Sequence, residues 1–258
     1  MKVLPVQLER LETGGGSVQE TPEGNFRLIL PPTARGYAVA QVDDYHQLPR
    51  RRFPWRPPLR LSLRARASHS HPIGTLGFGF WNDPFTFSLG QSGTARRIPA
   101  APQAQWFFYG SPPSDMTLVP GVPGHGWKAS SLDTPAIPSL LLAPIAAGAV
   151  ALTRVPCLRH WVMRVALQTI NAAERLLDPS LREWHRYSIT WLSEGATFEV
   201  DRETVLTSST LPSGPLGFVA WIDNQYAVAS PDGGFRFGVL PTEEEQWLEL
   251  TDLRLEVL

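Results

Sequence analysis

The sequence has 258 residues, of which 43% are hydrophobic and 18% charged, so it is long enough to form one globular domain with a sizeable core. Its formal net charge is -1, from 23 basic and 24 acidic residues, which argues against nucleic acid or an anionic membrane surface as the partner. The single cysteine, Cys157, excludes an internal disulfide bond, and the first residues show no apolar secretory segment, so we expect a cytoplasmic protein.

Short strands joined by turns are predicted over the first part of the chain. The 25 prolines and 21 glycines recur between short apolar runs, which is typical of this arrangement. The candidate strands are residues 26–30, 37–42, 59–67, 74–80 and 105–109. Residues 59–67 alternate apolar and polar side chains, so Arg60, Ser62 and Arg64 are expected to share one solvated face while the other face lies in the core.

A helical insertion is predicted at about residues 137–178. Residues 139–153 are almost wholly apolar, and a second helix would carry one apolar stripe made of Val162, Ala166, Ile170, Ala173 and Leu177. Because the apolar segment is shorter than the ~20 residues that a membrane-spanning helix needs, no transmembrane segment is expected. The helical hairpin is interpreted as a lid over a cleft, as an interfacial membrane contact, or as plain packing against the rest of the protein.

Strands are predicted again after the hairpin. They are residues 187–191, 197–200, 217–222, 235–239 and 247–257. The strand count and the turn spacing favour an all-β jelly-roll sandwich of two antiparallel sheets. Residues 1–258 are expected to form a single domain of this kind, with the helical segment inserted in it.

Several motifs resemble the strands of one superfamily. Residues 184–191, W-H-R-Y-S-I-T-W, and residues 196–201, A-T-F-E-V-D, are similar to a strand pair of family-sixteen glycoside hydrolases and laminin-G-like domains. The segments at residues 63–67, 74–81 and 251–255 resemble other strands of these proteins, whereas Arg202 stands where the family usually has glycine. The resemblance implies a concanavalin A-like sandwich.

The strand that carries the chemistry of those hydrolases differs in this sequence. In the family it reads E-x-D-x-x-E and supplies the two carboxylates that glycoside hydrolysis requires. The corresponding residues 105–109, Q-W-F-F-Y, contain no carboxylate, so hydrolysis by the family mechanism is not expected. As an enzyme, the protein would be a hydrolase or lyase that acts on a glycan through another acid and base, with Asp83 or Asp223 as the candidate base.

A repeated motif indicates a binding site. The motif L-G-F-x-x-W-x-D occurs twice, and in each copy the Trp and the Asp point to one face of the strand: Trp81 with Asp83, and Trp221 with Asp223. An aromatic plane covers the apolar face of a sugar, and a carboxylate accepts hydrogen bonds from its hydroxyls. Carbohydrate recognition is therefore the favoured function. In the alternative interpretation the tryptophans are core residues and the aspartates cap strand ends.

Other residues extend this candidate site. Gln225 would lengthen its polar edge, and Trp106 or Tyr109 would lie on the floor of the cleft. A different function also fits the sequence, in which an apolar small molecule is bound or transformed beneath the helical hairpin. The resemblance suggests one metal ion, a structural calcium, because Asp252 matches a position that often helps to hold calcium in related sandwiches.

Overall fold

The computed structural model describes residues 2–3, 7–84, 100–134, 169–230 and 234–258. Apart from one short 3-10 turn, η1 (Arg50–Arg52), all of its regular elements are strands. They are β1 (Lys2–Val3), β2 (Glu9–Thr13), β3 (Ser17–Glu20), β4 (Phe26–Leu30), β5 (Val39–Asp43), β6 (Leu59–Ala67), β7 (Thr75–Trp81), β8 (Gln103–Gly110), β9 (Gly126–Asp133), β10 (Asn171–Leu176), β11 (His185–Trp191), β12 (Ala196–Val200), β13 (Glu203–Ser208), β14 (Gly217–Asp223), β15 (Gln225–Ser230), β16 (Gly234–Val239) and β17 (Gln246–Val257).

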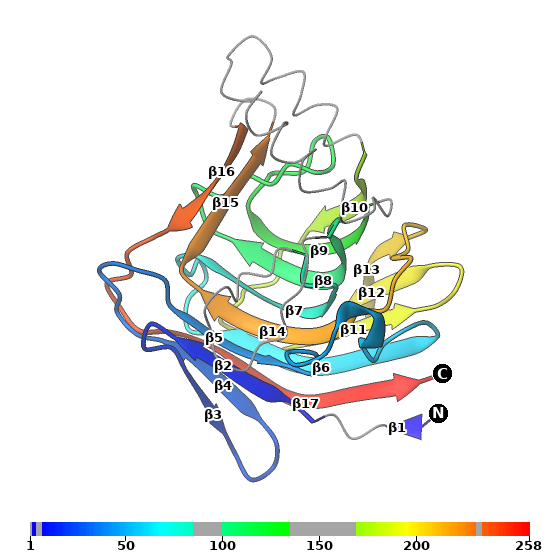
Figure 1. Ribbon diagram of the computed structural model, residues 1–258, viewed down its shortest axis with the longest axis horizontal. Coiled ribbons are helices and arrows are strands. Elements are labelled where there is room, and N and C mark those ends of the chain that lie inside the picture. The colour runs from blue at the N-terminus through cyan, green and yellow to red at the C-terminus, as the bar shows by residue number, and fades with distance from the viewer. Residues whose placement is uncertain (1, 4–6, 85–99, 135–168, 231–233) are drawn as a thin grey trace.

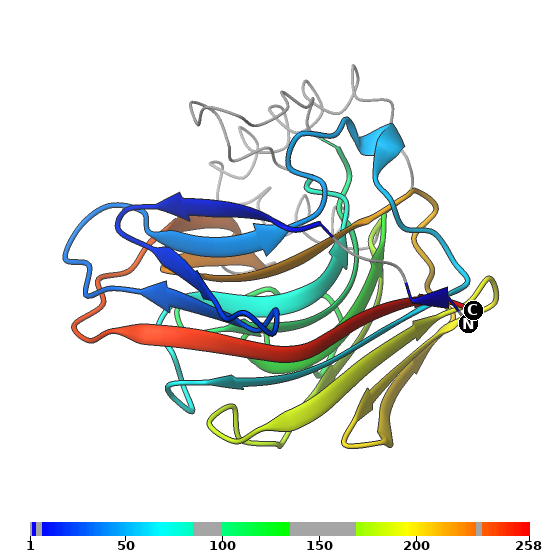
Figure 2. The same cartoon turned by 90° about the horizontal axis from the view of Figure 1, so that it is seen from below.

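The strands form two large antiparallel sheets and one hairpin. The eight-stranded sheet has the order β13-β12-β11-β6-β17-β4-β3, with β1 paired to one end of β17. The seven-stranded sheet has the order β10-β9-β8-β7-β14-β5-β2, and β15 and β16 pair with each other. Figures 1 and 2 show the two large sheets packed as layers, so the predicted all-β sandwich of two antiparallel sheets is confirmed.

The core lies between the two sheets and follows from alternation along the strands. In β6 every second residue from Leu59 is buried, and the intervening polar residues point outward. The facing sheet contributes Phe78 and Phe107, whose rings contact each other and the ring of Tyr187 from β11, with centroids 5.0 to 5.6 Å apart. Since a fully buried Leu or Phe side chain stabilises a fold by about 1.5–3 kcal/mol, this layer is the main source of stability.

The outer face of the eight-stranded sheet carries a ladder of alternating arginine and tryptophan side chains. Arg27 and Arg66 lie over the ring of Trp247, at 4.5 and 5.4 Å from its centroid. Arg66 and Arg64 lie over the ring of Trp184, at 4.8 and 5.4 Å. Each cation is therefore held against an aromatic face, which fixes the direction of side chains that would otherwise be mobile.

One part of the predicted helical insertion is a strand. Residues 171–176 form β10, which pairs along its whole length with β9, so the helical interpretation is wrong for this segment. Its sequence, N-A-A-E-R-L, is rich in helix-forming residues, but edge pairing to β9 satisfies its backbone hydrogen bonds and overrides that weak preference. The rest of the predicted hairpin, residues 137–168, lies outside the described residues. Over the described ranges, no helix has the length and apolar character needed to cross a membrane.

Candidate functional site

The outer face of the seven-stranded sheet is concave, because the sheet curls outward along strands β8 to β10 (Figure 1). In β7, glycines on this face alternate with core side chains such as Phe78. A Cβ atom on Gly77 would lie 2.8 Å from atom Cη2 of Trp221, and one on Gly79 would lie 2.7 Å from the Cβ of Trp106. Gly77 therefore leaves the space in which the Trp221 ring lies on the sheet, and Gly79 allows the backbone of β8 to approach closely at Trp106.

Four aromatic rings from three neighbouring strands form a platform on the concave face: Trp81, Trp106, Phe108 and Trp221. The rings of Trp81 and Trp221 are stacked, with an interplanar angle of 11° and centroids 6.3 Å apart. Trp106 bridges the group, with its centroid 5.8 Å from Trp81, 5.5 Å from Trp221 and 5.4 Å from Phe108. Trp81 and Trp106 are half-buried, whereas Trp221 and Phe108 are buried.

Two loops border the aromatic platform. From the loop that follows β5, Tyr45 and Phe53 pack against the platform with their rings 4.7 Å apart. The Tyr45 hydroxyl accepts a hydrogen bond from Nε1 of Trp81, which ties that indole to the loop. From the loop between β8 and β9, Met116 packs against the same cluster. The platform is thus held from two sides, and its ring orientations are fixed before any ligand arrives.

A polar group lies next to the platform on β5. Gln41 is the direct cross-strand neighbour of Trp221 and is half-buried. Its Nε2 donates to Oδ2 of Asp43 at 2.8 Å, and Nδ1 of His46 lies 3.3 Å from the same oxygen. The Asp43 side chain is fully buried and also accepts a hydrogen bond from the backbone N–H of Tyr45 at 3.1 Å. The sequence did not indicate His46 as a neighbour of the Asp43 carboxylate, because His46 lies in a loop and so belongs to no strand pattern.

A buried ion pair lies on the other side of the platform. Lys128 of β9 is the direct cross-strand neighbour of Phe108, and its Nζ lies 3.4 Å from Oε2 of Glu174 on β10. The two side chains are only 2% and 5% exposed, and Ser130 donates a hydrogen bond to the second Glu174 oxygen at 3.2 Å. Burial lowers the pKa of Lys128 and raises the pKa of Glu174, and the attraction between the two charges opposes both shifts.

The structure brings together three of the residues predicted for the binding site. Trp81, Trp106 and Trp221 come from β7, β8 and β14, which are neighbours in the sheet. Tyr109 does not join them, because it lies on the opposite face of β8, in the core, and is 3% exposed. The floor of the concave face is therefore lined by Trp106 and Phe108, the set on β8 that alternates with Phe107 and Tyr109.

The two aspartates of the repeated motif lie apart. Strands β7 and β14 are antiparallel, so Asp83 follows one end of the pair and Asp223 stands opposite Thr75 at the other end. Asp223 accepts hydrogen bonds from the Thr75 hydroxyl at 2.7 Å and from the backbone N–H of Gln225 at 3.0 Å. Burial raises the pKa of Asp223 to about 6. This arrangement favours the capping interpretation for Asp223, and Gln225 begins β15 with its backbone N–H bound to Asp223.

Asp83 and Asp252 both have backbone conformations that are rare for residues with side chains. Asp83 has φ 44° and is buried, and its carbonyl oxygen accepts a hydrogen bond from Nε of Arg50 at 3.2 Å. Asp252 has φ 55° at a bulge in β17, on the outer face of the opposite sheet, and is exposed. It shares a hollow there with Arg186 and Arg254. Positive neighbours oppose a bound cation, and no group of three His, Cys, Asp or Glu side chains suited to a metal ion occurs in the described part of the chain.

Comparisons with known proteins show similarity at the level of the backbone. No family model and no curated protein matches the sequence. Similar solved structures include a legume lectin-like domain from Entamoeba histolytica, at 9% identity and a TM-score of 0.48, with 97% of this chain and 90% of that chain covered. A glycoside hydrolase family protein from Mycobacterium thermorestibile gives 12% identity and a TM-score of 0.47, with 99% and 92% covered. A sialidase gives 8% identity and a TM-score of 0.45 over 97% of this chain, which spans only 17% of the sialidase.

Proposed function

We propose that the protein recognises a carbohydrate on its concave face. The observation that carries the proposal is the aromatic platform of Trp81, Trp106, Phe108 and Trp221, whose rings are stacked or tilted against one another over three adjacent strands. A sugar ring presents an apolar face of C–H groups, and an aromatic surface of this width would cover one or two such rings. The half-buried Trp81 and Trp106 are the members available for that contact.

Polar groups beside the platform would fix the orientation of the sugar. Nε2 of Gln41 is used in the hydrogen bond to Asp43, and within the described residues its Oε1 oxygen has no recorded partner, so it can accept from a sugar hydroxyl. A site of this kind, mostly apolar with a few placed polar groups, is typical of small-molecule binding surfaces. The sequence pattern alone suggested carboxylates in this role, but Asp223 is already engaged by Thr75 and Gln225.

The proposal is limited to recognition, because β8 presents Trp106 and Phe108, and no carboxylate, on the concave face. A retaining or inverting glycosidase needs two carboxyl groups on either side of the scissile bond. Two buried carboxyl groups lie beside the platform, and both are engaged by other groups: Asp43 by Gln41, Tyr45 and His46, and Glu174 by Lys128 and Ser130. We therefore infer binding without hydrolysis of the two-carboxylate type.

The test is a titration of the purified protein with a panel of neutral oligosaccharides and a panel of apolar metabolites, followed by tryptophan fluorescence and calorimetry. We expect saturable binding of at least one oligosaccharide, with an affinity loss of up to about ten-fold in Trp106→Ala, since one aromatic contact contributes about 0.5–1.5 kcal/mol beyond the area that it buries. Gln41→Ala should weaken binding of the same ligand by a smaller factor. The matched control is Trp184→Ala, which removes a half-buried tryptophan from the other sheet and should leave the affinity unchanged.

The outcome that would overturn the proposal is a response confined to apolar compounds. That result would favour the alternative in which an apolar molecule is the ligand. Because Trp106→Ala also removes packing, its thermal unfolding is measured alongside that of Trp184→Ala. A loss of binding counts only while the variant remains folded at the titration temperature.

A further inference from the structure

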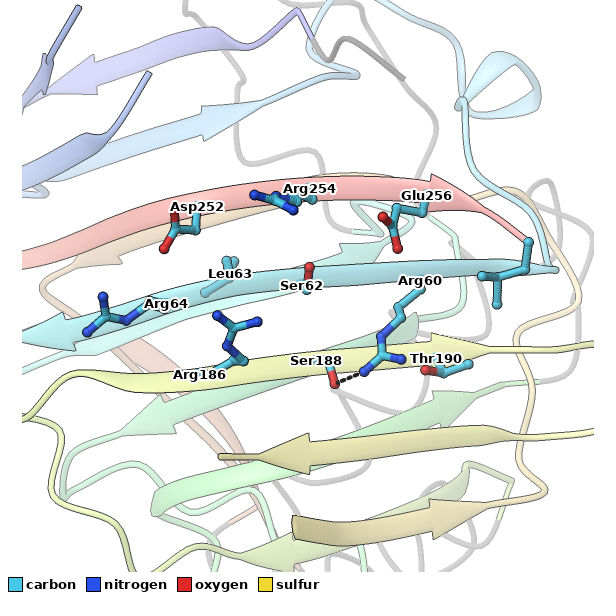
Figure 3. Close-up of a pocket in the computed structure, with 11 residues that line it drawn as sticks. Arg60, Ser62, Leu63, Arg64, Arg186, Ser188, Thr190, Asp252, Arg254 and Glu256 are labelled. Carbon is cyan, nitrogen blue, oxygen red and sulfur yellow. Dashed lines mark hydrogen bonds between the residues drawn. The ribbon is translucent and has the colours of Figure 1, made fainter. Parts of the chain in front are cut away.

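The outer face of the eight-stranded sheet has a hollow of about 340 Å³, far from the concave face. It lies over β6, β11 and β17, and Figure 3 shows arginines from all three strands around it. We call it the arginine hollow. The residues that line it are Arg60, Ser62, Leu63, Arg64, Arg186, Ser188, Thr190, Asp252, Arg254, Glu256 and Leu258.

The hollow arises from the register of the strands. Ser62 and Ser188 are direct cross-strand neighbours, so two short hydroxyl side chains form its floor. On one side of this pair stands the cross-strand pair of Arg64 and Arg186, and on the other side Arg60 lies opposite Thr190. Long side chains thus rise on both sides of a short pair. Alternation along β6 makes this possible, because its apolar residues all point into the core.

The arginines of the hollow are held in different ways. Arg60 is fixed by Glu199 at 2.8 Å and by the Ser188 hydroxyl at 3.2 Å, and Figure 3 shows it reaching from β6 toward β11. Arg64 is the last cation of the arginine and tryptophan ladder and lies over Trp184. The orientation of both guanidinium groups is therefore set by the protein, which lowers the entropic cost of binding an anion between them.

Two further arginines have no side-chain partner among the described residues. Arg186 and Arg254 are exposed, and over the described ranges neither side chain makes a recorded hydrogen bond or ion pair. Figure 3 shows Arg186 reaching from β11 toward β6, on the side of the serine pair where Arg64 lies. The two carboxylates of the hollow, Asp252 and Glu256, both come from β17 and make no recorded ion pair with these arginines. Two exposed guanidinium groups without a protein partner in the described ranges thus flank the hydroxyls, in a protein whose formal net charge is only -1.

We propose that the arginine hollow binds a tetrahedral oxyanion, phosphate or sulfate, free or as an ester on a sugar. Guanidinium groups match such oxyanions with paired hydrogen bonds, and the Ser62 hydroxyl can donate one more from below. A tetrahedral anion offers more acceptor oxygens to donors from three strands than a planar carboxylate does. Asp252 and Glu256 would repel an extended polyanion along β17, and they would accept hydrogen bonds from the hydroxyls of a small ester.

The test is calorimetric titration of the full chain at constant ionic strength with inorganic phosphate, inorganic sulfate, glucose 6-phosphate and glucose 6-sulfate, with glucose as the uncharged control. We expect saturable binding of the inorganic anions, and binding of an ester at least as tight. Tighter binding of an ester would assign the sugar as part of the ligand, and equal affinities would assign the oxyanion alone.

Two variants separate a shaped site from a merely positive surface. Arg186→Gln combined with Arg254→Gln should lower the affinity by about ten-fold or more, because it removes two of the charged donors that an oxyanion would accept hydrogen bonds from. Ser62→Val fills the floor without changing the charge and should lower the affinity by a similar factor. The control Arg182→Gln removes an exposed arginine outside the hollow and should have no effect.

The proposal fails if none of the four anions binds saturably, or if Ser62→Val binds them as well as the unchanged protein. It also fails if calcium, and not an anion, raises the melting temperature in a way that Asp252→Asn abolishes. Because the hollow and the aromatic platform lie on different sheets, Trp106→Ala should bind the oxyanion normally. If the arginine hollow binds no oxyanion, the proposal of carbohydrate binding on the concave face is unaffected. If the concave face binds no carbohydrate, the oxyanion proposal is likewise unaffected.

Discussion

Removal of one partner of the buried ion pair between Lys128 and Glu174 should destabilise the protein strongly. The two charged atoms are 3.4 Å apart and both side chains are almost completely buried. With an effective dielectric constant of ~20, their attraction is about 5 kcal/mol. Glu174→Gln leaves the Lys128 ammonium group buried without its counter-charge, which costs about 3–5 kcal/mol in comparable cases. We expect a loss near the lower end, because Asp115 also attracts this lysine.

The double variant Lys128→Met with Glu174→Met should be more stable than either single variant. It removes both charges and fills the space with apolar groups, and replacements of this kind are often close to neutral. The remaining cost is the loss of the hydrogen bond that Ser130 donates to Glu174, about 1 kcal/mol. The cycle comprises the unchanged protein, Lys128→Met, Glu174→Met and the double variant. With about 3 kcal/mol lost in each single variant and about 1 kcal/mol in the double, their free energies of unfolding from urea titrations should give a coupling energy of about 5 kcal/mol. Glu20→Gln, which breaks an exposed ion pair with Arg10, should cost at most about 1 kcal/mol.

The reasoning would be refuted if Glu174→Gln cost no more than Glu20→Gln. Such a result would mean that water reaches the ammonium group, and that the floor of the concave face is more hydrated beside Phe108 than the burial of Lys128 indicates. A double variant that is less stable than both single variants would also contradict it, because the charges would then contribute more than their desolvation costs.

Three further predictions concern other parts of the structure. Because burial raises the pKa of Asp223 to about 6, the folded state holds the extra proton between about pH 4 and pH 6, so the free energy of unfolding should fall by up to about 3 kcal/mol as pH rises through this window. Asp223→Asn should flatten that part of the urea-unfolding profile, and an unchanged slope would contradict the assignment. Gly77→Ala places a methyl group 2.4 Å from the backbone oxygen of Phe107 and 2.8 Å from the Trp221 ring, so it should cost about 1–3 kcal/mol and shift the tryptophan fluorescence. An unshifted spectrum would show that the platform tolerates the methyl group. Trp247→Ala removes two cation-π contacts, including that with Arg66, and should lower stability by about 1–2 kcal/mol in the same assay, whereas no change would show the ladder to be incidental.

Much of the fold could be predicted from alternation in the sequence. The predicted strands 59–67 and 26–30 coincide with β6 and β4, because each has one face in the core and one face toward solvent. Alternation of apolar and polar residues cannot reveal a strand when both of its faces are buried. In β9, Lys128 and two serines are buried on a strand whose sequence reads as a polar loop, and no period was visible there.

The candidate site could be predicted only in part. The spacing of Trp81 and Trp221 in a repeated motif placed both on one face, and the sheet confirms that the two strands are neighbours. The pair of Lys128 and Glu174 depends on β10 being a strand beside β9, whereas the composition of that segment favours a helix. Pairing with β9 makes this segment a strand, and no local pattern in the sequence indicates that pairing.

The position of β17 has a consequence for biosynthesis. This strand lies between β6 and β4, and the β4 and β6 segments precede it in the chain by well over a hundred residues. During translation, those two strands therefore have open edges that only a late segment can close, and open edges invite pairing with other chains. A ribosome-bound chain that stops short of β17 should accordingly be protease-sensitive and dependent on chaperones. Mutations in residues 246–257 should lower the yield of soluble protein more than their effect on the stability of the finished fold would suggest.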